Sequence, residues 1–131
     1  MSTNWPSYDC ADTLIYQTSA YGGSDDDVTT EKYTKTIDLA FNRAACIDIK
    51  HDSDGTTDDL VVNIYRSTDN VWDGDEQAIN SVTIPSDGSE DIYSLNISYY
   101  AGYGPGYYRL GLIRSGSTDT FAVDSKLRYG R

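Results

Sequence analysis

The sequence contains little of what most enzymes, membrane proteins and disulfide-rich domains require. Its 131 residues include one histidine, two cysteines and three prolines. Cys10 and Cys46 are too few for a disulfide framework or a zinc site, so we expect two reduced thiols, with a single 10–46 bridge as the open alternative. No apolar run approaches the length of a membrane span, and the polar start lacks the features of a secretory signal. We therefore expect neither membrane insertion nor export by the usual route.

Recognisable catalytic patterns are also missing. The single histidine, His51, borders an Asp-rich turn, and the chain has no GxSxG, HExxH, P-loop or dinucleotide-binding glycine pattern. Carboxylate pairs are common, but among 21 acidic residues they carry no specificity. We therefore predict that the protein is not an enzyme, with no catalytic residue, no bound metal and no cofactor.

Positive charge is scarce and unevenly placed. The net charge is −11, which argues against binding to nucleic acid or to anionic lipid. Residues 1–102 hold 19 acidic and 5 basic side chains, a net charge of −14, whereas residues 103–131 hold 2 and 5, a net charge of +3. Either the last strands simply direct Arg and Lys outward, which we favour slightly, or they form a weakly basic surface that meets an acidic neighbour.

What the sequence does have is a period-two alternation of apolar and polar residues. Ile37, Leu39 and Phe41 are predicted to share one face of a strand over residues 35–41. The same pattern predicts further strands near residues 14–19, 45–50, 60–65, 82–84, 93–97, 108–112 and 121–127. Asp-Gly and Ser-Gly pairs separate many of them, as turns require.

This pattern predicts an all-β fold, an antiparallel β-sandwich of about eight strands, jelly-roll-like or immunoglobulin-like. We expect one domain, in which residues 1–32 form an N-terminal segment with a first strand and a polar loop, and residues 33–131 form the sandwich core.

Two loops carry residues that invite a functional interpretation. The acidic stretch 52–59 resembles a calcium loop but lacks the full ligand set, and its Asp-Gly pair is already explained as a turn. We predict no specific calcium there. Trp72 lies near a hairpin tip, where it either folds back over the core or serves as a contact residue.

The segment 98–108 is unusually rich in tyrosine and glycine, a composition typical of binding surfaces. We predict an intermolecular contact at Tyr100, Tyr103 and Tyr107, with Trp5 and Tyr8 as a second candidate.

A competing interpretation has equal weight: the rings cover the open end of the sandwich. In that arrangement Tyr93, Tyr99 and Tyr108 point inward, and only Tyr103 is exposed.

The leaderless start, the Tyr-, Asp-, Gly- and Thr-rich composition, and a strand–turn–strand unit at residues 106–121 together resemble small β-sandwich structural proteins of tailed-phage virions, of the capsid decoration or cement type. This resemblance implies a non-enzymatic virion protein, assembled in the host cytoplasm, that docks on the outer capsid and stabilises it. Its implied partners are the major capsid or another virion protein and copies of itself, often as trimers. The alternative is a carbohydrate-binding module of jelly-roll type.

Overall fold

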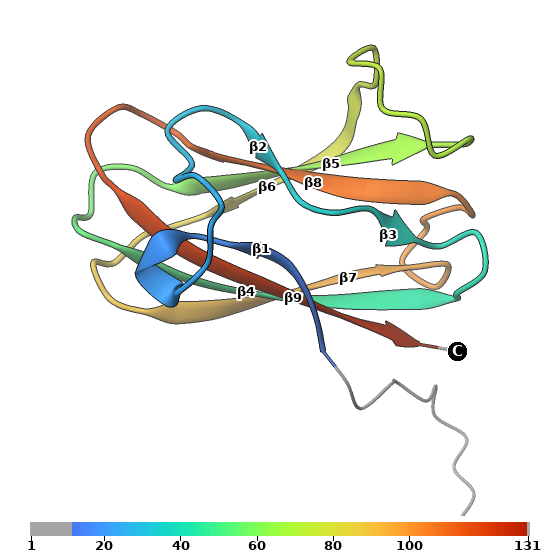
Figure 1. Ribbon diagram of the computed structural model, residues 1–131, viewed down its shortest axis with the longest axis horizontal. Coiled ribbons are helices and arrows are strands. Elements are labelled where there is room, and N and C mark those ends of the chain that lie inside the picture. Colours follow the sequence, from blue (N-terminus) through green and yellow to red (C-terminus); the bar gives the residue numbers. More distant parts are fainter. Residues whose placement is uncertain (1–11, 131) are drawn as a thin grey trace, which may run out of the picture.

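The computed structural model describes residues 12–130, which form two antiparallel β-sheets packed face to face (Figure 1). Within these residues no helix is long and apolar enough to cross a membrane. The elements in chain order are β1 (Thr13–Gln17), the 3₁₀ helix η1 (Ser19–Tyr21), β2 (Lys32–Tyr33), β3 (Ile37–Asp38), β4 (Ala44–Ser53), β5 (Leu60–Ser67), β6 (Ala78–Ile84), β7 (Asp91–Ser98), β8 (Tyr107–Arg114) and β9 (Phe121–Gly130).

The strand order identifies the sandwich as a jelly roll. One sheet has the order β1-β9-β4-β7, and the other has β2-β8-β5-β6, with β3 also paired to β8. The chain thus forms four nested antiparallel pairs, β1 with β9, β2 and β3 with β8, β4 with β7, and β5 with β6. This is a long hairpin rolled up on itself, as in a jelly roll, and it differs from the ABED and CFG sheets of an immunoglobulin domain. The prediction of an antiparallel sandwich of about eight strands is confirmed, with nine strands in residues 12–130.

The core lies between the two inner faces, where the predicted alternation holds on β4, β5, β8 and β9. Fully buried aliphatic residues include Ile47, Ile49, Val62, Leu110 and Leu112. Each such side chain contributes roughly 1.5–3 kcal/mol through removal from water. The segment before residue 33 belongs to the same core, because β1 pairs with β9 and the side chains of Ile15, Tyr16 and Val28 are buried.

The prediction for Phe41 is wrong. Ile37 and Leu39 are fully buried as expected, but Phe41 is 84% exposed, because β3 ends at Asp38. The Asp38 carboxylate accepts a hydrogen bond from the Ala40 N–H at 2.8 Å, and this side-chain turn leads the chain out of the sheet. The apolar residue at the next alternating position is therefore carried to the surface.

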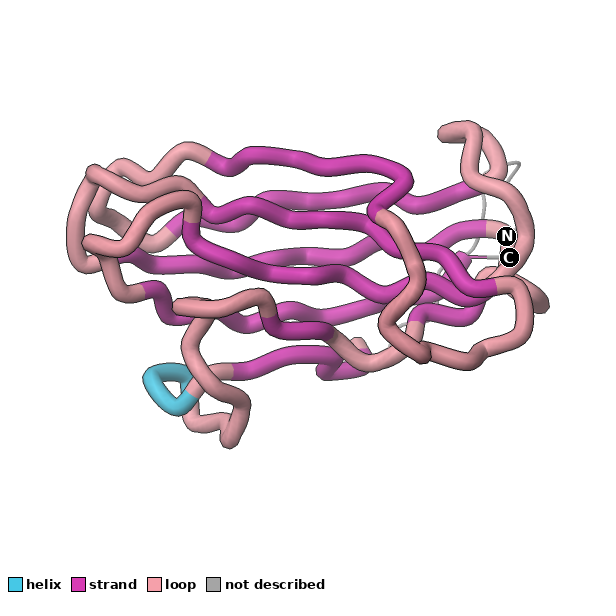
Figure 2. Tube along the Cα trace, turned by 90° about the horizontal axis from the view of Figure 1, so that it is seen from above, coloured by secondary structure: helices cyan, strands magenta, loops and turns pink. Residues whose placement is uncertain are grey.

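The loops gather at the two ends of the sandwich (Figure 2). One end, here called the Asp end, holds loops 18–31, 54–59, 85–90 and 115–120. The opposite end, here called the Tyr end, holds loops 39–43, 68–77 and 99–106.

Candidate functional site

The Tyr end contains the tyrosine-rich loop that the sequence singles out. Its first part is a tight turn, in which the N–H groups of Ala101 and Tyr103 both donate to the carbonyl of Ser98, at 3.1 and 3.0 Å. Gly102 completes the turn with a φ of 89°, in the left-handed region that glycine adopts without strain. Tyr100 lies at the tip of this turn, and its side chain is 78% exposed.

The three tyrosines of the predicted contact therefore have different environments. Only Tyr100 is exposed; Tyr103 and Tyr107 are half-buried. The Tyr103 ring meets Tyr108 edge to face at 5.9 Å, and its hydroxyl accepts a hydrogen bond from the Asn80 amide at 3.0 Å. Tyr108 is fully buried and donates to the Gly104 carbonyl at 2.6 Å. Tyr103 and Tyr108 thus close the end of the core, whereas Tyr100 is available for contact.

A second loop, 39–43, is joined to the tyrosine-rich loop by Tyr99. The Tyr99 N–H donates to the Arg43 carbonyl at 3.2 Å, and its hydroxyl donates to the Leu39 carbonyl at 2.6 Å. Phe41 lies near the middle of the joined loop, so Phe41 and Tyr100 are carried by two loops that hold each other in place. Alternation could not have identified Phe41 as a surface residue, because it assigned that side chain to the core.

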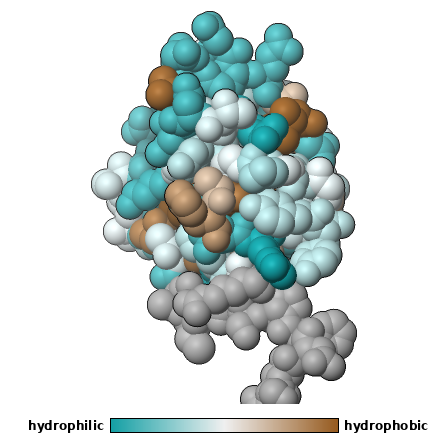
Figure 3. Space-filling view, turned by 90° about the vertical axis from the view of Figure 1, so that its right-hand side faces the viewer, coloured by the Kyte–Doolittle hydropathy of each residue, from teal (hydrophilic) through white to brown (hydrophobic). Residues whose placement is uncertain are grey.

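The Tyr end lies on the right in Figure 1 and faces the viewer in Figure 3. The part of it that is not grey is largely hydrophilic, with separate groups of hydrophobic residues. Trp5 and Tyr8, the second candidate contact, lie outside the described residues. Together, Phe41 and Tyr100 give this end two highly exposed aromatic side chains on a fixed backbone.

At the Asp end, the carboxylates bind backbone. Asp58 and Asp119 are both 3% exposed, and each accepts two N–H groups from the loop that carries the other. One Asp58 oxygen accepts from Thr118 and Asp119 at 2.8 Å each; one Asp119 oxygen accepts from Thr57 and Asp58 at 2.8 and 2.7 Å. We call this arrangement the Asp58–Asp119 clasp. It gives the acidic loop a structural role that sequence reasoning missed, because its two halves are 61 residues apart.

Glycine makes the clasp possible. A Cβ atom at Gly55 would lie 2.5 Å from an Asp119 oxygen, and one at Gly116 would lie 2.2 Å from an Asp58 oxygen. Both loops therefore need glycine beside the opposing carboxylate. Within residues 12–130, no group of three or more His, Cys, Asp or Glu side chains is placed to hold a metal ion.

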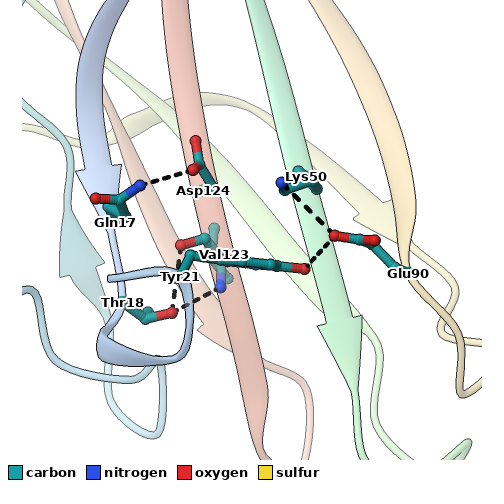
Figure 4. A network of polar contacts seen from close by, with 7 residues as sticks. All are labelled: Gln17, Thr18, Tyr21, Lys50, Glu90, Val123 and Asp124. Carbon is teal, nitrogen blue, oxygen red and sulfur yellow. Dashed lines mark hydrogen bonds and ion pairs between the residues drawn. The ribbon is translucent and has the colours of Figure 1, made fainter. Parts of the chain in front are cut away.

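The outer face of the β1-β9-β4-β7 sheet carries a network that fastens loop 18–31 (Figure 4). Tyr21 reaches across the sheet and donates to Glu90 at 2.9 Å, while the Lys50 ammonium lies 4.6 Å from the Tyr21 ring centre and 3.6 Å from Glu90. Burial, and then the hydrogen bond to Glu90, raise the pKa of the Tyr21 hydroxyl. On the β1 side, Gln17 donates to Asp124 at 2.8 Å. These groups satisfy one another, which is the behaviour of a structural network.

The outer face of the other sheet holds a stack of Tyr33, Arg109 and Trp72. The Arg109 guanidinium lies 3.8 Å from the Tyr33 ring centre and 4.6 Å from that of Trp72. Trp72 folds back and donates its indole N–H to Thr36 at 3.1 Å. Trp72 thus folds back over the outer face of the sheet, and not over the core as one of its two predicted placements had it.

The basic residues of the last strands do not form one surface. Arg109 lies on the outer face of one sheet, and Arg128 lies on the other, where it pairs with Asp48 at 2.7 Å and with Asp12 at 3.1 Å. Arg114 donates to the Asp119 carbonyl at the Asp end. The places of these three arginines favour the simpler interpretation of the charge asymmetry.

His51 is placed where it cannot meet a ligand at the surface. It is 2% exposed, on the inner side of β4, and burial lowers the pKa of its imidazole.

No model of a known protein family matches the chain, and no curated protein matches it.

Proposed function

We propose that this chain is a non-enzymatic structural protein of a tailed-phage virion, a decoration or cement protein that docks on the outer capsid through the Tyr end. The observation that supports this proposal most is the pair Phe41 and Tyr100, 84% and 78% exposed on loops that Tyr99 joins. Exposed aromatic rings on an ordered backbone offer large contact area at a low cost in conformational entropy. Such residues are typical anchors of protein–protein contacts.

The rest of the described surface suits this role. The polar groups at the Asp end form hydrogen bonds within that end, and those on the β1-β9-β4-β7 face form hydrogen bonds and an ion pair within that face. Both sets make the scaffold more rigid. A rigid scaffold lowers the ordering cost of binding, because fewer loops and side chains lose conformational freedom on contact.

The alternative is a carbohydrate-binding module, for which the Tyr33–Arg109–Trp72 stack is the best platform. A sugar ring stacks on an open aromatic face, but Arg109 already covers one face of each of these two rings. The capsid proposal is therefore the stronger of the two. A glycan array separates them, since a carbohydrate-binding module gives a reproducible glycan signal that Tyr33→Ala abolishes.

The test uses phage heads that lack the protein, and it measures binding by co-sedimentation. The double variant Phe41→Ser/Tyr100→Ser is compared with wild type and with Leu14→Ser, which removes another exposed apolar side chain from β1. An anchor residue contributes about 2 kcal/mol or more, so the double variant should bind at least about 30-fold more weakly at unchanged thermal stability. Wild-type binding by the double variant would contradict the proposal.

A further inference from the structure

The two sides of the sandwich differ in how their sheet edges are protected. On the side of β1, β2 and β3, the chain covers its own edge: Lys35 donates to the Ile15 carbonyl at 3.1 Å, and Asp25 donates to the Gln17 carbonyl at 3.0 Å. The Asp25 carboxylate also accepts the Gln17 N–H at 2.7 Å. This edge is also interrupted, because β2 and β3 have two residues each.

On the opposite side, β6 and β7 are long, unprotected edge strands. Among residues 12–130, β6 has seven residues and pairs only with β5, and β7 has eight and pairs only with β4. Both lie at the back in Figure 1, on the side away from β1 and β2. An antiparallel edge strand leaves every second N–H and C=O without a strand partner. The one side-chain cap recorded along β6 is the Asn80 amide oxygen, which accepts the Ser81 N–H at 2.8 Å.

This side is also where charge is missing. Residues 77–86 and 92–98 contain no Asp, Glu, Lys or Arg, in a chain whose charged residues make up 24%. Natural proteins usually protect an exposed edge with lysine, an internal proline or a bulge at its centre. β6 and β7 contain no lysine and no proline, and the register shift of β6 lies at its first residues.

Apolar side chains are exposed along the same side. Ile79, at the register shift of β6, is 52% exposed, and Ile92, on the outer face of β7 opposite Lys50, is 65% exposed. Val82 on β6 and Tyr93 on β7 pack against the core but are only partly buried. Apolar area, free backbone groups and an absence of charge therefore coincide on one side of the molecule.

We propose that this β6–β7 side is a self-association surface, on which the same side of a second copy docks edge to edge. The charge distribution favours a second copy over other partners: two chains that each carry −11 can approach closely only where neither carries charge. A contact between identical surfaces is self-complementary and closes as a twofold dimer. The inference does not depend on capsid docking, which uses the Tyr end.

The surroundings of the edge predict a distinctive salt dependence. Acidic residues flank β6 at both ends, with Asp75 and Glu76 before it and Asp87, Glu90 and Asp91 after it. When two copies of β6 pair in antiparallel fashion, the start of one strand lies beside the end of the other, so acidic groups face acidic groups. Salt screens this repulsion, and association should strengthen as salt is added.

Sedimentation velocity of the full chain tests the proposal between micromolar and millimolar concentration, at about 20, 150 and 500 mM NaCl. We expect a monomer–dimer equilibrium that tightens several-fold across this salt range. The variants Ile79→Asp and Ile92→Asp should each weaken dimerisation tenfold or more. The matched control Leu14→Asp adds the same charge on the β1 edge and should dimerise as wild type.

Hydrogen exchange provides a second measurement that a purely electrostatic effect would not reproduce. Amides of β6 that point away from β5 should gain protection as protein concentration rises, while amides of loop 99–106 should not. A wild-type chain that stays monomeric under all these conditions, or Ile79→Asp and Ile92→Asp variants that dimerise as wild type, would overturn the proposal.

The outcome is separable from that for capsid docking. Phe41→Ser/Tyr100→Ser should dimerise normally and fail to bind heads. The variant Ile92→Asp, whose residue lies near the Asp end of β7, should bind heads as a monomer.

Discussion

Replacing Asp58 with alanine removes the acceptor of two backbone N–H groups at the Asp end. Asp58 is 3% exposed, and its carboxylate holds the N–H groups of Thr118 and Asp119 at 2.8 Å each. A hydrogen bond to a charged group contributes about 1.5–3 kcal/mol, so the two bonds together contribute about 3–6 kcal/mol. Because water can reach part of the opened loop, we expect Asp58→Ala to lower the free energy of unfolding by about 3 kcal/mol. With an unfolding entropy of about 2.1 cal/mol/K per residue, this corresponds to a fall in Tm of about 10 °C.

Urea unfolding followed by circular dichroism measures this change, with Asp59→Ala as the control. Asp59 precedes the buried start of β5, and the contact recorded for it is made by its backbone, which bonds to Ser115. Its replacement should change stability by no more than about 0.5 kcal/mol. The double variant Asp58→Ala/Asp119→Ala should cost clearly less than the sum of the two single variants, since the clasp is one unit whose halves bind each other.

The same experiment distinguishes a clasp from a calcium site. Millimolar calcium should leave the Tm of the wild-type chain unchanged, and a chelator should not lower it, because a ligand that binds only the native state must stabilise it. A small effect of Asp58→Ala without metal, together with a calcium-dependent rise in Tm of several degrees, would refute the reasoning.

Three further predictions concern other parts of the molecule. Burial, only partly offset by nearby carboxylates, holds the pKa of His51 below its ordinary value of 6.5. As the pH falls, the unfolded chain therefore binds a proton at His51 before the folded chain does. The free energy of unfolding should fall as the pH drops below about 7, and it should level off below the folded-state pKa. Urea midpoints between pH 5 and 8 should show this slope in wild type and lose it in His51→Gln, and equal slopes would contradict the prediction. Tyr103→Ser should lower the free energy of unfolding by about 1–2 kcal/mol, because it removes the edge-to-face contact with Tyr108. Tyr100→Ser should change it by no more than about 0.5 kcal/mol, because that side chain is exposed; thermal melts measure both changes. Gly111→Ala should lower the free energy of unfolding by about 1–3 kcal/mol, because the alanine Cβ would lie 2.5 Å from a Glu31 oxygen and 2.8 Å from the Tyr65 ring. A variant as stable as wild type would show that the side chains on this outer face can rearrange freely.

The sequence predicts the fold class because alternation is a local signal. Ile47 and Ile49, and likewise Leu110 and Leu112, follow one another with period two, and the structure buries all four. The choice between a jelly roll and an immunoglobulin-like sandwich is not local. It depends on pairings such as β1 with β9, which join residues more than 100 positions apart and leave no mark in the pattern of either strand.

The surface sites were predicted less well, for a related reason. Composition identified the loop that carries Tyr100, but it could not separate that ring from Tyr103, whose half-buried state depends on Asn80 and Tyr108. Phe41 continues the period-two apolar pattern of Ile37 and Leu39, and it is exposed because of the turn at Asp38. The clasp was hidden because its carboxylates, Asp58 and Asp119, bind the backbone of distant loops.

The proposed docking at the Tyr end is tested most directly by quantitative binding to phage heads that lack the protein. The account predicts saturable binding at a fixed number of sites per head, raised thermal stability of the decorated head, and loss of both effects with Phe41→Ser/Tyr100→Ser but not with Leu14→Ser. Absence of saturable binding by the wild-type chain, or equal binding by the Phe41→Ser/Tyr100→Ser variant, would contradict it.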